Sequence, residues 1–378
     1  MNEAIYDTAV IGGGLAGLSV SILLAEKGFK VILLEKEQYP FHKVCGEYIS
    51  MESWGFIKGL GLDLDLLNLP KINKLIVTAP NGRELHQALD IGGFGISRYK
   101  LDSSLKDIAV RKGVQVVEDC KVDSVTFNNE LFTIKCGVRE FNSNVCCGSF
   151  GKRSNLDIKW MRPFTTQSNN KLNNYIGIKY HIEIDFPADS IALHNFKNGY
   201  CGISKIEDNR YCLCYLTNAE NLKHSNNNIR DMECNILSAN PHLHRIFTTA
   251  TKLYSFPLTI SQVSFNRKTQ VENHVLMLGD AAGLIAPLCG NGMSMAMNSA
   301  KIAADSIEKY LKKNISRKAM ETSYKLQWKK TFNKRLAIGR FIQSLFGRTS
   351  ITNSFITLLK AFPSVTKSLI RHTHGDSF

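Results

Sequence analysis

The sequence predicts an α/β fold, in which a parallel-sheet nucleotide domain holds an inserted antiparallel sheet and is followed by helices. Three observations predict it. Residues 6–35 read as buried strand, glycine turn, helix, second strand and acid. Residues 160–254 change to alternating, aromatic-rich runs separated by turn residues. The segment after residue 312 is helical in pattern and strongly basic.

Length and composition are those of a globular protein. The 378 residues are enough for about two domains. The N-terminal residues run straight into the first strand, which predicts no signal peptide, and no window of about eighteen unbroken apolar residues predicts a spanning helix. Ten cysteines without small-domain spacing predict reduced thiols and a cytoplasmic location. No cysteine–histidine group has zinc-site spacing, so no metal is predicted.

The first turn predicts a dinucleotide site. Gly12, Gly14 and Gly17 hold the G-x-G-x-x-G positions. The first glycine permits a tight turn, the second lets a pyrophosphate approach the backbone, and the third lets the helix pack on the strand. Glu35 ends the second strand, where its carboxylate can accept both hydroxyls of an adenosine ribose. The neighbouring Ala16 and Lys36 are included among the predicted cofactor contacts.

The elements that follow are read in order from periodicity and turn residues. A polar loop over 36–50 precedes a short helix over 51–59. A hairpin over 71–89 turns at 80–83, and a helix spans 101–112. Strands are predicted at 113–117, 122–138 and 141–148. The inserted sheet takes its strands from four runs: 175–185, 190–196, 200–206 and 210–216.

The last third returns to the nucleotide domain. An apolar strand over 271–278 ends at Gly279-Asp280 and is followed by a glycine loop and a helix over 293–312. In the basic segment, four apolar residues recur every four positions, which predicts an apolar face. This face is expected to pack on the core; the sharper alternative is contact with a membrane surface or with the substrate. The four residues are Tyr324, Trp328, Phe332 and Leu336.

The second glycine–acid site indicates that the dinucleotide is FAD. Asp280 can hydrogen-bond a ribityl hydroxyl, and a nicotinamide dinucleotide does not require this site. The helix that begins near Gly292 can direct its positive dipole end to the flavin edge, where negative charge gathers on reduction. Gly279, Gly290 and Asn291 complete this group of predicted contacts.

Four blocks resemble the FAD-dependent oxidoreductases that share the fold of p-hydroxybenzoate hydroxylase, and within them the geranylgeranyl reductase group. They are residues 12–35; Lys43-Val44-Cys45-Gly46-Glu47, similar to K-x-C-G-G; Arg98 with residues 101–105, similar to R-x-x-L-D-x-x-L; and residues 279–292, including Pro287-Leu288-Cys289. The resemblance implies that the Cys45 segment lies near the flavin and that Arg98 lies along the FAD, so both Cys45 and Arg98 are among the predicted cofactor contacts.

The resemblance also implies domain boundaries, and the sequence departs from the family's motifs at several positions. A Rossmann-like FAD-binding domain takes residues 1–72, 92–159 and 255–312, a substrate domain takes 73–91 and 160–254, and a basic helical segment takes 313–378. The family's Asp-Gly pair reads Phe150-Gly151 here, which argues against direct NADPH use, and Glu47 replaces a common glycine. The reductase motif Y-x-W-x-F-P-K is only partly matched at 200–205, and the tryptophan motif of flavin halogenases is absent from the sequence.

The leading hypothesis is an FAD-dependent oxidoreductase that reduces C=C bonds of a prenyl or polyene chain, with Cys45 and Glu47 as candidate catalytic residues. The alternative is a monooxygenase of an aromatic or polyketide substrate; a remote one is a non-catalytic flavin-containing binding protein. The electron donor is NAD(P)H or a reduced ferredoxin or flavodoxin. Residues 301–378 carry 16 Lys+Arg and 4 Asp+Glu, and the whole chain has a net charge of +14. This segment can dock an acidic electron carrier or touch a membrane; a nucleic-acid partner is disfavoured.

Overall fold

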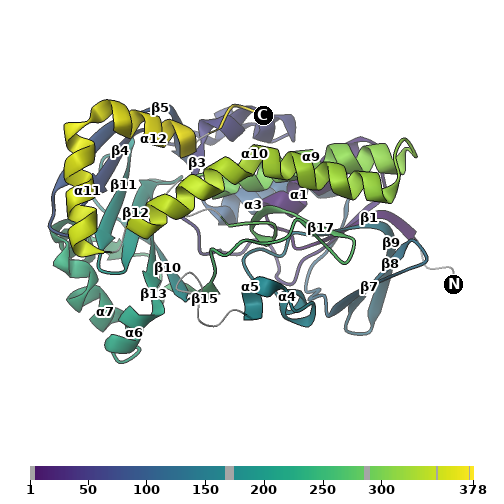
Figure 1. The fold of residues 1–378 in the computed structure, drawn as a ribbon, viewed down its shortest axis with the longest axis horizontal. Coiled ribbons are helices and arrows are strands. Elements are labelled where there is room, and N and C mark those ends of the chain that lie inside the picture. The colour runs from purple at the N-terminus through teal and green to yellow at the C-terminus, as the bar shows by residue number, and fades with distance from the viewer. Residues whose placement is uncertain (1–4, 167–173, 285–289, 346–347, 374) are drawn as a thin grey trace.

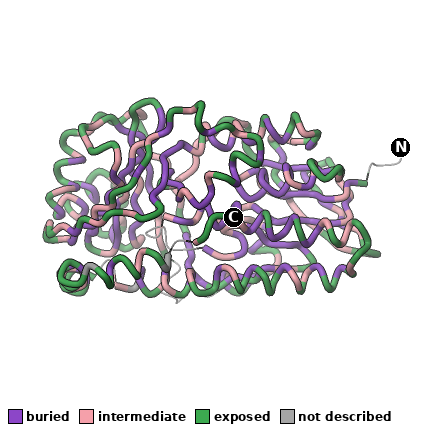
Figure 2. The backbone as a smooth tube through the Cα atoms, turned by 90° about the horizontal axis from the view of Figure 1, so that it is seen from above, coloured by how far each residue is buried: buried purple, intermediate pink, exposed green. Residues whose placement is uncertain are grey.

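The computed structural model describes residues 5–166, 174–284, 290–345, 348–373 and 375–378. Two β-sheets lie side by side along the length of the molecule, and helix α10 (Arg317–Leu345) runs from one toward the other (Figure 1). Buried backbone fills the interior of both halves (Figure 2). Within the described ranges no helix combines the length and apolar composition needed to cross a bilayer.

The first sheet is the nucleotide-binding one. Its strand order is β16-β17-β9-β1-β2-β6, with a β7–β8 hairpin attached to β9. β1 pairs in parallel with β2 and β9, and every residue of β2 is buried, as expected for a parallel sheet covered on both faces. The strands are β1 Ile5–Ile11, β2 Val31–Leu34, β6 Gln115–Val117, β7 Ser124–Asn128, β8 Leu131–Cys136, β9 Arg139–Gly148, β16 Val271–Glu272 and β17 Val275–Met277.

The second sheet is mostly antiparallel, in the order β14-β10-β13-β12-β11-β4-β5-β3, and β15 pairs with β10. The predicted hairpin joins this sheet through a parallel β4–β11 pair. The strands are β3 Tyr48–Ser50, β4 Lys71–Thr78, β5 Glu84–Gly95, β10 Tyr175–Glu183, β11 Ser190–Phe196, β12 Gly199–Lys205, β13 Tyr211–Asn218, β14 Thr251–Lys252 and β15 Leu258–Val263.

Helices cover the two sheets. α1 (Leu15–Glu26) packs against α3 (Arg98–Arg111) and α9 (Gly292–Leu311), and α10 packs on α9. Tyr324, Trp328, Phe332 and Leu336 of α10 are all buried, so the prediction of a core-packing face is confirmed. The other α-helices are α2 Trp54–Gly59, α4 Asn155–Lys159, α5 Pro163–Thr166, α6 Ala219–His224, α7 Ile229–Asn235, α8 Pro241–Thr249, α11 Thr349–Ala361 and α12 Pro363–Thr373.

The structure confirms the predicted α/β fold class and corrects one strand. The apolar run 271–278 is not a single strand, because Asn273 and His274 adopt left-handed φ angles of +47° and +65° and turn the chain into the β16–β17 hairpin. β3 and β15 also join the second sheet, although both lie outside the sequence ranges predicted for it. Residues 287–289 of the fourth sequence block lie outside the described residues.

Candidate flavin site

The glycine turn after β1 has the geometry that its spacing predicts. Gly12 has a φ of +99°, and a Cβ there would lie 2.7 Å from the carbonyl oxygen of Ser149. A Cβ on Gly17 would lie 2.0 Å from the carbonyl oxygen of Gly12. Only glycine allows these close approaches between strand ends and helix start.

Gly14 instead faces two cations. The nearest atoms to a Cβ placed there are Arg98 Nη2 at 3.6 Å and Lys43 Nζ at 3.7 Å. Gly14 also precedes the first residue of α1, where free N–H groups and the positive helix end favour an anion. The backbone, the helix terminus and two cations therefore fit a pyrophosphate, as FAD binding requires.

Glu35 lies against the same turn. Its side chain is buried, and Oε2 accepts a hydrogen bond from the Gly13 N–H at 2.7 Å while Oε1 accepts one from the Lys36 N–H at 2.8 Å. This places a carboxylate beside the glycine turn, where the adenosine ribose is expected. Lys36 contributes its backbone; its exposed ammonium lies 3.3 Å from Glu37.

Arg98 is fixed by a buried carboxylate one turn later in α3. Arg98 Nε and Nη2 each lie 2.7 Å from an oxygen of Asp102, and Lys43 Nζ lies 3.0 Å from Oδ2. Burial alone would raise the pKa of Asp102, but the two cations outweigh it and lower that pKa. Asp102 thus stays ionised and holds both cations opposite Gly14.

Replacing Arg98 with lysine is expected to weaken FAD binding roughly 10- to 100-fold, because lysine keeps the charge but loses the bidentate pair, worth about 1.5–3 kcal/mol. Titration of each apoprotein with FAD, followed by flavin fluorescence, measures the change in the dissociation constant. Arg111→Lys is the matched control, since Arg111 is exposed in the last turn of the same helix. Equal losses in the two variants would contradict this role for Arg98.

The second predicted contact group lies next to the first. Gly279–Ala281 forms a 3-10 turn, η4, and a Cβ on Gly279 would lie 3.3 Å from Cβ of Ala16 in α1. Asp280 lines a small cavity together with Gly292 and Trp328. Gly290 has a φ of +65° and precedes the N-terminus of α9, with Asn291 between them and buried. The structure therefore brings Ala16, Asp280 and the start of α9 together.

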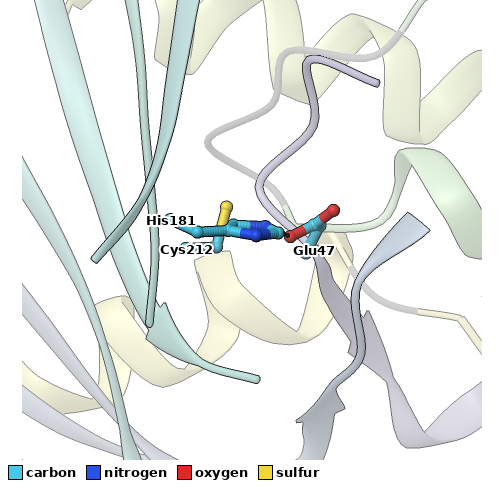
Figure 3. A group of neighbouring side chains, drawn as sticks. All are labelled: Glu47, His181 and Cys212. Carbon is cyan, nitrogen blue, oxygen red and sulfur yellow. Dashed lines mark hydrogen bonds and ion pairs between the residues drawn. The ribbon is translucent and has the colours of Figure 1, made fainter. Parts of the chain in front are cut away.

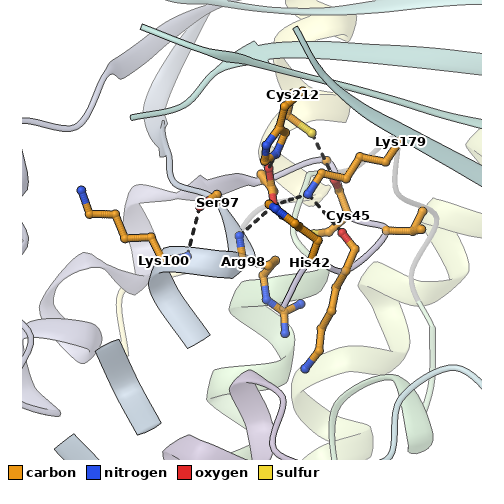
Figure 4. A network of polar contacts seen from close by, with 12 residues as sticks. His42, Cys45, Ser97, Arg98, Lys100, Lys179 and Cys212 are labelled. Atoms are coloured by element: carbon orange, nitrogen blue, oxygen red, sulfur yellow. Dashed lines mark hydrogen bonds and ion pairs between the residues drawn. The ribbon is translucent and has the colours of Figure 1, made fainter. Parts of the chain in front are cut away.

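Cys45 lies at the junction of the two sheets (Figure 4). Its half-buried thiol is 3.6 Å from the sulfur of Met293 in the first turn of α9. The Cys45 carbonyl accepts a hydrogen bond from the Cys212 thiol of β13 at 3.2 Å. Cys45 therefore lies close to the start of α9, in the same loop as Lys43, one of the two cations that face Gly14.

Glu47 has a different environment, because it is fully buried in an ion-pair cluster. It accepts hydrogen bonds from Lys179 Nζ and, at 2.8 Å, from the Arg98 N–H, and it lies 2.6 Å from His181 Nε2 (Figure 3 shows His181 and Glu47). Burial raises the pKa of Glu47, but the charge of Lys179 and the contact with His181 outweigh it and lower that pKa. Glu47 is therefore held as a carboxylate.

This cluster continues into a histidine–tyrosine chain. His181 Nδ1 lies 3.2 Å from the Tyr254 hydroxyl, which lies 3.0 Å from His42 Nε2. The His42 ring stacks on Tyr99, with centroids 4.6 Å apart. Cys212 Sγ lies within 4.8 Å of the ligand-type atoms of Glu47 and His181, but Lys179 already neutralises that carboxylate, which favours an ion-pair network over a metal centre.

Phe150 lies two residues after the end of β9, where the resembled family has an acid. Its Cα would lie 2.9 Å from a Cβ on Gly12, so the residue borders the glycine turn. The half-buried ring packs toward Trp160, with centroids 6.3 Å apart. Phe150 thus places an aromatic ring where the resembled family has a carboxylate. The identity of the electron donor stays a prediction.

Sequence reasoning missed the partners from β10. Lys179 and His181 lie about 130 positions after Glu47. They lie on one face of β10 because they are two residues apart in a strand, and residues 177–182 are all buried, so burial does not distinguish that face. It also missed Tyr39, whose hydroxyl donates to the Gly13 carbonyl across the glycine turn. No spacing rule connects these residues to the motifs.

Comparison with known proteins identifies the first half of this site. Residues 5–135 match the family model of an FAD binding domain. The chain is 24% identical over 334 residues to conditioned medium factor receptor 1 of Dictyostelium discoideum, covering 80% of this chain and 63% of that protein's length. It is 25% identical over 365 residues to digeranylgeranylglycerophospholipid reductase of Methanococcus vannielii, covering 88% of this chain and 85% of the relative.

The solved structure of the flavin-dependent brominase Bmp2 has a TM-score of 0.80 and 22% identity, covering 98% of this chain and 93% of its own. These matches confirm the predicted fold class, an FAD-binding domain and a flavin-dependent enzyme. Because a reductase and a brominase both match at low identity, the narrower prediction of the geranylgeranyl reductase group is not confirmed.

Proposed function

We propose that this FAD-dependent oxidoreductase reduces carbon–carbon double bonds of a hydrophobic prenyl or polyene substrate. The observation that carries the proposal is the Cys45 thiol, half-buried between the two sheets and 3.6 Å from the first turn of α9. Once reduced by the electron donor, bound FAD would supply hydride to such a substrate. The chain must then supply a proton donor next to the flavin edge, and the position of Cys45 beside the first turn of α9 supports it as our candidate for that donor.

The ion-pair cluster gives the two predicted catalytic residues, Glu47 and Cys45, different roles. Glu47 is neutralised by Lys179 and kept ionised, so it holds no proton to donate. We assign it a positioning role, since its carboxylate fixes the backbone N–H of Arg98 and the ammonium of Lys179. Cys45 remains the candidate acid. Similarity to digeranylgeranylglycerophospholipid reductase over 88% of this chain supports a prenyl substrate.

A monooxygenase or halogenating enzyme is the second candidate. The observation that favours it is the TM-score of 0.80 with a flavin-dependent brominase. Both candidates use the same FAD cradle, and they differ in whether oxygen is consumed. Oxygen dependence of turnover therefore separates them.

Cys45→Ala is expected to slow anaerobic reduction of a geranylgeranyl lipid by about 10²- to 10⁴-fold while FAD stays bound, because it removes the proton donor alone. Flavin reoxidation after mixing pre-reduced holoenzyme with the lipid, together with mass analysis of the saturated product, measures the rate. Cys234→Ala is the control, since Cys234 is an exposed cysteine of α7.

Unchanged rates in Cys45→Ala would remove that residue from catalysis. Absence of any anaerobic turnover in wild type, with oxygen-dependent hydroxylation or halogenation instead, would overturn the reductase proposal in favour of the second candidate.

A further inference from the structure

The C-terminal part of the chain lacks acidic residues over a long stretch. Residues 322–375 contain ten Lys+Arg and no Asp or Glu. The stretch includes most of α10 and all of α11 and α12. Lysines on α10, such as Lys325, Lys329 and Lys334, are exposed, and none of the three forms an ion pair within the described residues. Arg335 and Lys367 lie near Glu52 and Asp90, and the surface formed by the rest of this stretch is positively charged.

Helix α11 carries apolar side chains both on the side that packs on the protein and on an exposed side. Its inner side places Ile356 and Leu359 against Val77, Ala79 and Leu85 of the β4–β5 hairpin region. Its outer side continues into α12 and leaves large apolar side chains half exposed or more. These residues, called here the outer face, are Ile351 at 40%, Leu358 at 52%, Phe362 at 53% and Val365 at 52% exposed.

The outer face spans the junction of α11 and α12. Ile351 and Leu358, seven residues apart, lie on one side of α11, whereas Phe362 lies at the break between the two helices and Val365 lies in the first turn of α12. Thr366 is buried and donates a hydrogen bond to the Leu359 carbonyl at 2.8 Å, which fixes the start of α12 on the end of α11. Arg348, Lys360 and Arg371 flank the face and are exposed.

We propose that the outer face binds the surface of an anionic lipid bilayer. Apolar side chains flanked by cations are the pattern that inserts into the headgroup region while the cations meet lipid phosphates. Lys367 lies 3.2 Å from Asp90, and Asp90 lies on β5 beneath these helices, so one nearby cation is already neutralised. The remaining cations favour a negatively charged partner.

A bilayer fits this face better than a second copy of the chain. Two copies meeting through their outer faces would bring two acid-free, cationic segments together, and like charges repel across such an interface. The proposal does not depend on the reaction that the flavin site performs. Figure 1 shows α11 and α12 at the opposite end of the molecule from β7–β9, so docking leaves that end of the nucleotide sheet free.

The test uses the flavin-loaded protein and two kinds of vesicle: phosphatidylglycerol mixed with phosphatidylcholine, and phosphatidylcholine alone. Wild type is expected to co-float with the anionic vesicles, less so at high salt, and not with the neutral ones. The Leu358→Glu/Phe362→Glu variant is expected to lower the partition coefficient by about tenfold or more, because it replaces two inserting side chains with acids.

The Val138→Glu/Met161→Glu variant is the matched control. It makes the same charge change at two exposed apolar residues outside the C-terminal helices, 104% and 76% exposed, and is expected to bind like wild type. Flavin content and thermal unfolding establish that all variants are folded. Equal binding to neutral vesicles, equal losses in the two variants, or no binding of wild type to anionic vesicles would each overturn the proposal; the last result would favour an acidic protein partner.

Discussion

Replacing Lys179 with methionine is expected to lower the free energy of unfolding by about 3–5 kcal/mol, because it leaves the buried Glu47 carboxylate without its main partner. Both side chains are almost fully inaccessible, at 1% and 0% exposed. His181 and the Arg98 N–H remain near Glu47 but carry less compensating charge. Denaturant unfolding of the two proteins at neutral pH measures the difference.

The pH dependence of this effect has a definite sign. The pKa of Glu47 is lowered in the folded protein, so its contribution to stability is present above its unfolded pKa of about 4.3 and is lost as the pH falls through the folded pKa. In Lys179→Met the largest lowering influence is gone, so burial dominates and the pKa of Glu47 rises. The stability difference between wild type and variant therefore shrinks in acid.

Two further variants separate an unpaired charge from lost packing. Glu47→Gln/Lys179→Met removes both charges and is expected to recover much of the loss. Lys74→Met breaks an exposed pair with Asp189, 62% and 41% exposed, and is expected to cost less than about 1 kcal/mol. If Lys179→Met were no more harmful than Lys74→Met, Glu47 would not depend on its buried partner.

Substituting Gly17 by valine is expected to weaken FAD binding by about 100-fold or more, since overpacking costs up to about 3 kcal/mol at a site that cannot yield. The new Cβ would meet the Gly12 carbonyl oxygen at 2.0 Å and Ser149 Oγ at 2.4 Å. Relief would move α1 away from the glycine turn and misplace its free N–H groups. Flavin retained after gel filtration, and FAD titration of the apoprotein, measure the loss.

Gly55→Ala controls for glycine replacement as such. Gly55 lies in α2, where an added Cβ meets nothing within 4 Å, and alanine is the better helix former. Normal FAD binding by Gly55→Ala with loss in Gly17→Val is the expected pair of results. Retention of FAD by Gly17→Val would show that the close contact between α1 and the strand ends is dispensable.

The sequence predicts the parts of the site whose residues lie close together along the chain. Gly12, Gly17 and Glu35 lie within one strand–helix–strand unit, so the turn geometry follows from intervals of a few residues. The same holds for the Arg98–Asp102 pair, one helical turn apart.

The remainder depends on how distant strands align. Lys179 and His181 reach Glu47 only because β10 lies against the Cys45 loop, and Gly177, whose added Cβ would lie 3.1 Å from Val44, allows that approach. The break at Asn273 and His274 was missed for another reason: flanking apolar residues continue the strand pattern through a left-handed turn.

The Glu47 cluster also bears on how the protein unfolds. One carboxylate is bonded both to the first N–H of α3, which packs on α1, and to Lys179 in the second sheet. A partial opening that moved α3 away from the second sheet would break the bond from the Arg98 N–H to Glu47 and admit water to the buried Glu47–Lys179 pair. We therefore expect the two sheets to open as one cooperative unit, and substrate entry to rely on side chains at the edge, such as Tyr99, 41% exposed and stacked on His42.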